Sequence, residues 1–100
     1  MARRDVHPLR GADDRYVLDV QAEVLSQRAT RAVVPLLPAA AAPKPIGELN
    51  PVFDIGGRPH VLVTQAIATV PARELKPAVA SLAEHRDRVT RALDLLLVGL

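Results

Sequence analysis

The clearest hydrophobic pattern in the chain lies in its last twenty residues, Ser81 to Leu100. Ser81 and Glu84 have the spacing of a capping box, which satisfies free amide groups at the start of a helix. Apolar residues then recur at helical spacing and define one face, which consists of Leu82, Val89, Ala92, Leu93 and Leu96. The pattern predicts an amphipathic C-terminal helix that packs on the rest of the domain, because an isolated helix of this length is only marginally stable.

The end of this predicted helix is apolar on nearly every side. Leu95, Leu97, Val98 and Leu100 lie partly off the packing face, and Gly99 suits a left-handed helix cap. Exposed apolar residues at a chain end are typical of a surface that binds a second copy of the chain or another protein. The alternative is that the tail folds back into the protein's own core, and the pattern by itself leaves both interpretations open.

Alternating and β-branched segments in the first half of the chain predict strands. In the clearest of them, residues 15–25, apolar side chains alternate with polar ones, which is typical of an antiparallel strand with one solvated face. The apolar set is Tyr16, Leu18, Val20, Ala22 and Val24, and the polar set is Asp19, Gln21 and Glu23. Residues 31–37 form a β-branched run in which Pro35 indicates a sheet edge or a strand end. Residues 1–9 predict a weaker strand, because Arg4 shares a face with Val6 where an apolar residue is expected.

The second half of the chain predicts a hairpin and several turns. Residues 49–55 and 60–66 are its two strands, and Gly56-Gly57 is the turn between them. Residues 38–47 hold three prolines and indicate an irregular connection. Thr69–Pro71 predicts a turn, and Ala72–Leu75 predicts one helical turn. Together with the terminal helix, these segments predict a mainly β fold: a small antiparallel sheet or partly open barrel with one helix packed on it.

Composition restricts the possible functions. One hundred residues are expected to form a single domain, residues 1–100. Tyr16 and Phe53 are the only aromatic residues, which argues against a base-stacking platform for single-stranded nucleic acid. The net charge is only +2, and there is no cysteine to form a disulfide or a thiolate site. No apolar run is long enough to span a membrane and no signal peptide is evident, so we expect a cytoplasmic protein without membrane contact.

Residues that could support catalysis or metal binding are isolated. His7, His60 and His85 lie far apart in the sequence and no cysteine accompanies them, whereas zinc sites need several convergent ligands. Ser26 and Ser81 lack any motif that would pair them with a base. The two adjacent glycines lie between strands rather than before a helix, so they do not form a phosphate-binding loop. The residues therefore predict a binding protein that is not an enzyme and needs no cofactor or metal.

Six segments, in the same order and at nearly constant spacing, resemble the CcdB family, the toxins of plasmid and chromosomal toxin–antitoxin modules. They are RYVLDVQ (Arg15–Gln21), TRAVVPL (Thr30–Leu36), LNPVFDIGG (Leu49–Gly57), TQAIATVP (Thr64–Pro71), VASLAEHRD (Val79–Asp87) and RALDLLLVGL (Arg91–Leu100). The resemblance covers nearly the whole chain. It implies an SH3-like barrel of about five antiparallel strands plus a smaller sheet and one C-terminal helix, the CcdB/MazF-like toxin fold, assembled as a homodimer.

The same resemblance implies a function. Members of this family bind the A subunit of DNA gyrase and trap the enzyme on cleaved DNA. A CcdA-like antitoxin neutralises the toxin, and the pair represses its own operon, so contact with operator DNA occurs only through the antitoxin complex. The resemblance places the poisoning residues at Val98, Gly99 and Leu100, and further gyrase contacts at Val24, Leu25, Asp94 and Leu97.

The chain departs from the family at one of these positions. Val98 stands where the best-known members carry tryptophan. Loss of a buried tryptophan anchor typically costs at least ~2 kcal/mol, or roughly thirtyfold in affinity. Gyrase poisoning is therefore expected to be weakened, redirected to a variant gyrase, or lost while antitoxin binding persists.

Two other functions are compatible with the sequence. The first is an mRNA endoribonuclease like MazF and Kid, which share the barrel fold. General acid–base cleavage could then use His7 or His60 with Asp54 and Arg58, although the N-terminal motifs of that family are missing. The second is a non-toxic chromosomal relative retained for antitoxin binding and operon regulation.

Overall fold

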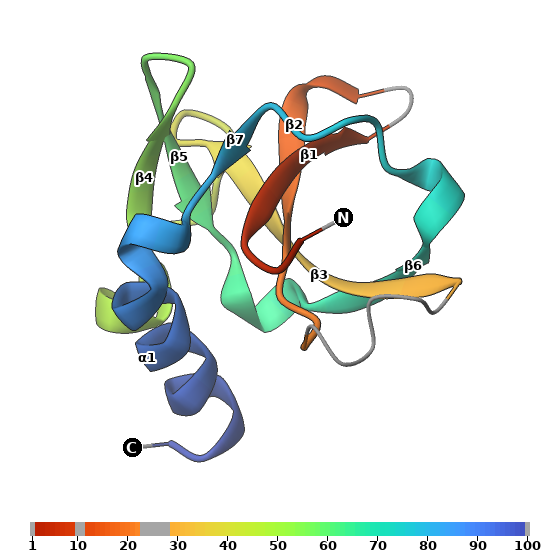
Figure 1. Ribbon diagram of the computed structural model, residues 1–100. Coiled ribbons are helices and arrows are strands. Elements are labelled where there is room, and N and C mark those ends of the chain that lie inside the picture. The colour runs from red at the N-terminus through yellow and green to blue at the C-terminus, as the bar shows by residue number, and fades with distance from the viewer. Residues whose placement is uncertain (1, 10–11, 23–28, 100) are drawn as a thin grey trace.

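The computed structural model describes residues 2–9, 12–22 and 29–99. Its described residues form seven antiparallel strands and one α-helix (Figure 1). The strands are β1 (Asp5–Leu9), β2 (Ala12–Asp19), β3 (Thr30–Pro38), β4 (Val52–Ile55), β5 (Arg58–Leu62), β6 (Ala68–Pro71) and β7 (Ala80–Ser81), and the helix is α1 (Arg86–Leu97). The strand order is β4-β5-β3-β2-β1-β7, and β6 pairs with the N-terminal half of β3.

The sheet curls into a nearly closed barrel because β3 is long enough to have two partners on one side. Its first half pairs with β6 and its second half pairs with β5. The chain after β6 then returns along β1, where the Lys76 amide donates to the Pro8 carbonyl (3.0 Å) and the Val79 amide donates to the Val6 carbonyl (2.9 Å). Figure 1 shows the resulting ring of strands, with the β4–β5 hairpin to one side and α1 below that hairpin. The predicted mainly β barrel with one C-terminal helix is confirmed.

Both faces of the β1–β2–β3 part of the sheet carry apolar residues. Outside the barrel, side chains from the strands meet α1 in the larger cluster, which includes Val6, Leu18, Val34, Leu36, Phe53, Ile55, Leu62, Leu82, Val89 and Ala92. Inside the barrel, a smaller cluster consists of Val17, Val33 and Leu75, with Leu9 and Val70 beside it. Val89 and Ala92 are the buried residues of α1, so the packing face predicted for the helix is confirmed at these positions.

The helix begins later than the capping-box pattern predicts. Ser81 belongs to β7 and pairs with Asp5 of β1, so its backbone is extended rather than helical. Its hydroxyl oxygen accepts a hydrogen bond from the Ala83 amide at 3.2 Å, and a 3₁₀ turn over Ala83–His85 follows. Pairing with the exposed edge of β1 therefore takes precedence over the local helical preference of residues 81–85. α1 itself starts at Arg86, and no side chain caps it.

The prediction of a half-solvated strand over residues 15–25 is wrong. β2 runs from Ala12 to Asp19, and Val17 and Asp19 on the predicted polar face are buried. The face is buried because the barrel closes over it. Part of the predicted strand, including Val24 and Leu25, lies outside the described residues.

Pro35 does not mark a sheet edge, because β3 is an interior strand. The Pro35 carbonyl accepts a hydrogen bond from the Val63 amide at 2.9 Å. In an antiparallel strand, the amide and the carbonyl of one residue point to the same side. The side of Pro35 that lacks an N–H therefore faces the gap between the end of β5 and the start of β6. The proline therefore removes no ladder hydrogen bond from either partner strand.

The remaining short segments follow the prediction in part. The hairpin is confirmed, with Gly56 and Gly57 at φ 62° and 83°, as a two-residue turn with two left-handed positions requires. Its second strand ends at Leu62, and Thr64–Ala66, predicted as strand, form a 3₁₀ turn. The irregular connection after β3 and the helical turn over Ala72–Glu74 are also confirmed. Thr69–Pro71, predicted as a turn, instead belongs to β6. Arg4 lies in the turn before β1 with φ 69°, so it does not occupy the strand face where an apolar residue was expected.

Candidate functional site

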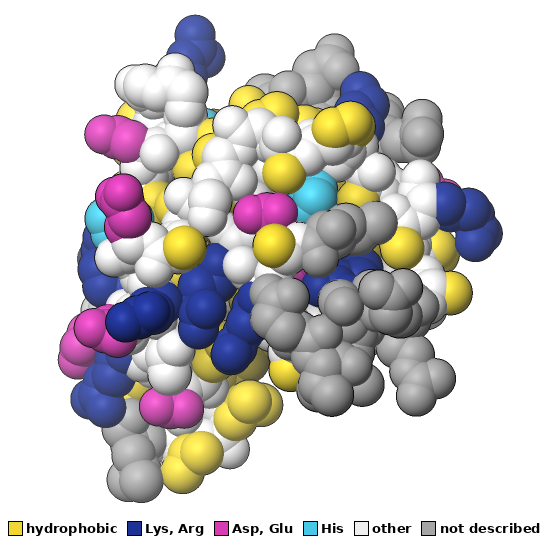
Figure 2. Space-filling view, in the orientation of Figure 1, with side chains coloured by type: hydrophobic (Ala, Val, Ile, Leu, Met, Phe, Trp, Pro, Cys, Tyr) yellow, Lys and Arg dark blue, Asp and Glu magenta, His cyan; other side chains and the backbone are white. Residues whose placement is uncertain are grey.

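The C-terminal end of α1 presents apolar side chains to solvent. Leu97 is 72% exposed and Val98 is 65% exposed, the two highest values among the large apolar side chains of the described residues. Leu95 and Leu96 are half-buried. Figure 2 shows hydrophobic side chains gathered at the end of the molecule where α1 ends. Of the two interpretations of the tail, the structure therefore contradicts folding back into the core for Leu97 and Val98.

The chain leaves α1 through a defined cap. Gly99 has φ 82°, a left-handed conformation that a glycine adopts without a steric penalty, as predicted from the sequence. The amides of Val98 and Gly99 both donate to the carbonyl of Asp94, at 2.8 and 3.0 Å. The cap fixes the direction in which the last residues leave the helix. It holds Val98 on the surface instead of allowing the helix to continue.

The rest of α1 is fixed to the β4 edge, so the tail projects from a rigid support. The Arg88 guanidinium lies over the Phe53 ring at 4.5 Å from the centroid and donates a hydrogen bond to the Val52 carbonyl at 3.1 Å. Arg91 forms an exposed ion pair with Glu48, with 3.6 Å between Nε and Oε2. These contacts and the burial of Val89 and Ala92 hold α1 against the barrel.

The structure describes four of the seven residues that the family resemblance assigns to gyrase binding. Asp94, Leu97, Val98 and Gly99 are all exposed and lie within the last turn of α1 and its cap. Val24, Leu25 and Leu100 lie outside the described residues. The four described positions thus lie close together in the chain at the C-terminal end of α1, and their role in gyrase binding stays a prediction.

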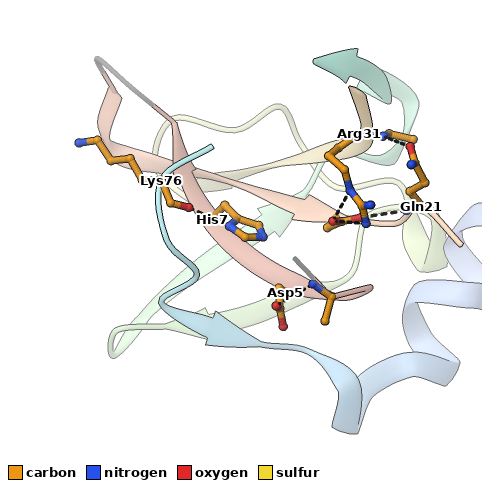
Figure 3. Close-up of polar contacts among 8 residues, drawn as sticks. Asp5, His7, Gln21, Arg31 and Lys76 are labelled. Carbon is orange, nitrogen blue, oxygen red and sulfur yellow. Dashed lines mark hydrogen bonds and ion pairs between the residues drawn. The ribbon is translucent and has the colours of Figure 1, made fainter. Parts of the chain in front are cut away.

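A buried ion pair beneath the end of β2 was not predicted. Asp19 and Arg31 are both 0% exposed, and Asp19 Oδ2 accepts from Arg31 Nε at 2.8 Å and lies 2.6 Å from Nη2. Asp19 Oδ1 accepts from the Gln21 amide, and Gln21 Oε1 accepts from the Ala32 amide (Figure 3). The network links the chain that leaves β2 to β3. In the sequence Asp19 has the spacing of a solvent-facing residue, and no local signal indicates its burial.

The residues that would serve an endoribonuclease are only partly brought together: His60 and Arg58 line one cleft, whereas Asp54 and His7 lie elsewhere. Asp54 alternates with Phe53 and Ile55 and is exposed on the opposite face of the β4–β5 hairpin. His60 pairs with Phe53 across the hairpin and therefore shares its buried face. His7 lies on β1, where Nδ1 donates to the Lys76 carbonyl at 2.8 Å (Figure 3). The proposed acid–base set of a histidine with Asp54 thus lacks the convergence that proton transfer needs.

Two further observations concern metal ligands and membrane-spanning helices. Within residues 2–9, 12–22 and 29–99, no group of three or more histidine, aspartate or glutamate side chains is placed to hold a metal ion. In the same part of the chain, α1 is too short and too polar to cross a membrane.

Comparison with known proteins identifies the family. The family described as "CcdB protein" matches residues 4–99, nearly the whole chain. The chain belongs to the CcdB family. Membership of the CcdB family supports the role of a toxin in a toxin–antitoxin system.

A solved structure extends the comparison to the fold. The structure described as Mycobacterium tuberculosis toxin MazF-mt6 aligns with a TM-score of 0.75 and 18% sequence identity. The alignment covers 93% of this chain and 95% of that chain. At this level of identity the likeness shows that a CcdB-family chain and a MazF toxin share one barrel fold, and it carries no statement about activity.

Proposed function

We propose that this CcdB-family protein is a toxin that binds the A subunit of DNA gyrase and traps the gyrase–DNA cleavage complex. It acts by binding and not as an enzyme. The observation that carries the proposal is the exposure of Leu97 and Val98 on a helix end that is otherwise firmly packed. Apolar side chains in this position cost solvation free energy in the free protein, and binding to an apolar surface of a partner recovers it.

The proposal includes the partners that the family resemblance implies. The protein acts as a homodimer in the cytoplasm, and a CcdA-like antitoxin neutralises it. The toxin–antitoxin complex, and not the toxin alone, binds operator DNA and regulates its own transcription. In a plasmid setting the same module would serve plasmid maintenance.

Substitutions at Val98 test the site in both directions. Val98→Asp places a charge in the proposed contact and should abolish gyrase poisoning, whereas Val98→Trp restores the aromatic anchor of the family. A tryptophan anchor contributes about 2 kcal/mol or more, so the Trp variant should poison at concentrations roughly thirtyfold lower. The measurement is accumulation of cleaved DNA and loss of supercoiling with purified gyrase over a range of toxin concentrations.

Val79 provides the matched control, because it is a valine with 58% exposure on a different part of the surface. Val79→Asp and Val79→Trp should leave gyrase poisoning unchanged. Loss of the effect in both Asp variants would indicate a general surface defect and would contradict a site at the tail. An absence of cleavage complexes at micromolar wild-type and Val98→Trp protein would reject gyrase as the target.

Growth of cells that express the protein separates the remaining functions. Growth arrest that depends on residues 98–100 and is relieved by co-expression of a CcdA-like antitoxin agrees with the proposal. Arrest accompanied by cleavage of a defined RNA in vitro would instead support a MazF-like endoribonuclease. Absence of arrest, with antitoxin binding retained, would identify a non-toxic relative.

A further inference from the structure

A cleft separate from the C-terminal tail lies between the β4–β5 hairpin and the chain that leaves β3. Its volume is about 520 Å³, and Pro38, Ala41 and Ile55 contribute to its apolar walls. The turn after β3 is held against the hairpin because the Ala39 amide donates to the Pro59 carbonyl at 3.0 Å. The hairpin tip and the C-terminus lie at opposite ends of the molecule (Figure 1). A ligand in this cleft would therefore not cover the tail.

His60 supplies the buried polar group of this cleft. The side chain lines the cleft and is only 3% exposed. Its Nδ1 lies 3.0 Å from the Arg58 carbonyl oxygen, which can only accept, so Nδ1 carries the proton. In the neutral ring Nε2 is then a hydrogen-bond acceptor, and no described residue donates to it. An acceptor that lines a cleft and receives no hydrogen bond from a described residue can pair with a ligand that brings a donor.

Two other polar side chains line the same cleft. The Tyr16 ring packs against His60 with 5.2 Å between centroids and a 59° tilt, and its hydroxyl has no hydrogen-bond partner among the described residues. Arg58 is exposed at the rim, and its guanidinium forms no ion pair with any described residue. Asp54 does not balance this charge, because it occupies the other face of the hairpin. The cleft thus combines an acceptor, a hydroxyl and a cation between apolar walls.

We propose that this cleft binds a small planar organic anion: a ring that carries an N–H or O–H donor and a carboxylate or phosphate group. The donor of the ring pairs with His60 Nε2, and the ring packs on Tyr16 and the apolar walls. The anionic group pairs with the Arg58 guanidinium at the rim, where a charge-assisted hydrogen bond is stronger than a neutral one. A mostly apolar cleft with a few unpaired polar groups is typical of small-molecule sites. This binding site does not depend on the proposed gyrase activity.

The test is a titration of the ¹⁵N-labelled full-length protein, followed by amide chemical shifts. Uridine 5′-monophosphate and orotate present the same ring with a phosphate or a carboxylate, and uracil and inorganic phosphate each present one half of the ligand. We expect the first two to shift the amides of Gly56 and Arg58 at millimolar concentrations or below. Uracil and inorganic phosphate should each bind about tenfold more weakly or not at all, because each lacks one of the two contacts.

Conservative variants assign the binding to the cleft. Arg58→Gln removes the cation and Tyr16→Leu removes the ring on which the ligand packs, and each should weaken binding by about fivefold to tenfold. Arg15→Gln is the matched control because Arg15 is exposed and does not line the cleft. The dispersion of the amide spectrum confirms that each variant is folded. The proposal is overturned if neither uridine 5′-monophosphate nor orotate shifts the amides of Gly56 and Arg58 at about 10 mM ligand. This concentration is roughly the highest dissociation constant expected from the contacts above. It is also overturned if inorganic phosphate binds as well as uridine 5′-monophosphate, or if the two cleft variants bind like Arg15→Gln.

Discussion

Replacement of Asp19 by asparagine tests the contribution of the buried ion pair to stability. Asp19 and Arg31 are both fully buried, and Arg31 approaches the same carboxylate oxygen through Nε and Nη2, at 2.8 and 2.6 Å. Asparagine keeps the shape of the side chain and an oxygen that can accept from the Gln21 amide. The substitution therefore removes the negative charge and replaces Oδ2, which accepts from Arg31, by an NH2 group that cannot accept. It leaves Arg31 buried without a counter-charge.

The expected loss is large relative to the stability of a small domain. Unit charges about 4 Å apart attract by about 4 kcal/mol at an effective dielectric constant of about 20. Removal of one partner from a buried ion pair typically costs about 3–5 kcal/mol, because the remaining charge is buried and uncompensated. We expect Asp19→Asn to lower the free energy of unfolding by this amount. Because the total free energy of unfolding of a small domain is about 5–15 kcal/mol, the variant would lose a large part of its stability.

The assay is equilibrium urea unfolding followed by circular dichroism, at one fixed protein concentration because self-association would add to the apparent stability. The double variant Asp19→Asn/Arg31→Met removes both charges and should be more stable than Asp19→Asn alone. The control is Glu48→Gln, which breaks the exposed pair with Arg91 at 3.6 Å and should cost at most about 1 kcal/mol.

Two results would refute the reasoning. If Asp19→Asn costs less than about 1 kcal/mol, the pair contributes no more than an exposed one and its burial carries no energetic consequence. The second concerns the single variants Asp19→Asn and Arg31→Met. If the double variant loses as much unfolding free energy as these two lose together, the side chains act independently and are not an ion pair in solution.

Three further stability predictions follow from burial and backbone conformation. Val89→Ala should lower the free energy of urea unfolding by about 2 kcal/mol, because Val89 is only 2% exposed. Leu97→Ala at the exposed helix end should change it by no more than about 0.5 kcal/mol. Equal losses in the two variants would show that Leu97 is buried in solution. Gly57→Ala should cost about 1–2 kcal/mol because its φ is 83°, and an unchanged urea midpoint would contradict the left-handed turn. Arg88→Met should lose about 1 kcal/mol with the Phe53 and Val52 contacts, and a thermal unfolding curve identical to wild type would show that these contacts do not hold α1.

Local features of the chain could be predicted because their causes are local. The helical spacing of Val89 and Ala92 places both on one face of α1 whatever the helix packs against. Adjacent glycines between two β-rich segments specify the hairpin turn, since only glycine adopts two successive left-handed conformations easily. Gly99 likewise predicts the cap that ends the helix. The exposed tail could be named as a candidate site on the same basis, but the spacing did not decide whether it was exposed.

Features that depend on distant segments could not be predicted from the pattern. Period-two alternation tells which residues of a strand share a face, but not whether another part of the chain covers that face. Asp19 was therefore placed in solvent, although closure of the barrel buries it and the distant Arg31 neutralises it. Residues 80–81 pair with β1 because that edge is free, and α1 consequently starts at Arg86.

The sequence by itself thus determined the kinds of element, their order and the apolar C-terminus, because spacing and turn chemistry act over a few residues. Only the tertiary structure decided which face of β2 is buried, where α1 begins and that Leu97 and Val98 remain on the surface. The physical reason is that burial depends on contacts between segments far apart in the chain. Those contacts form only when the sheet curls into a barrel.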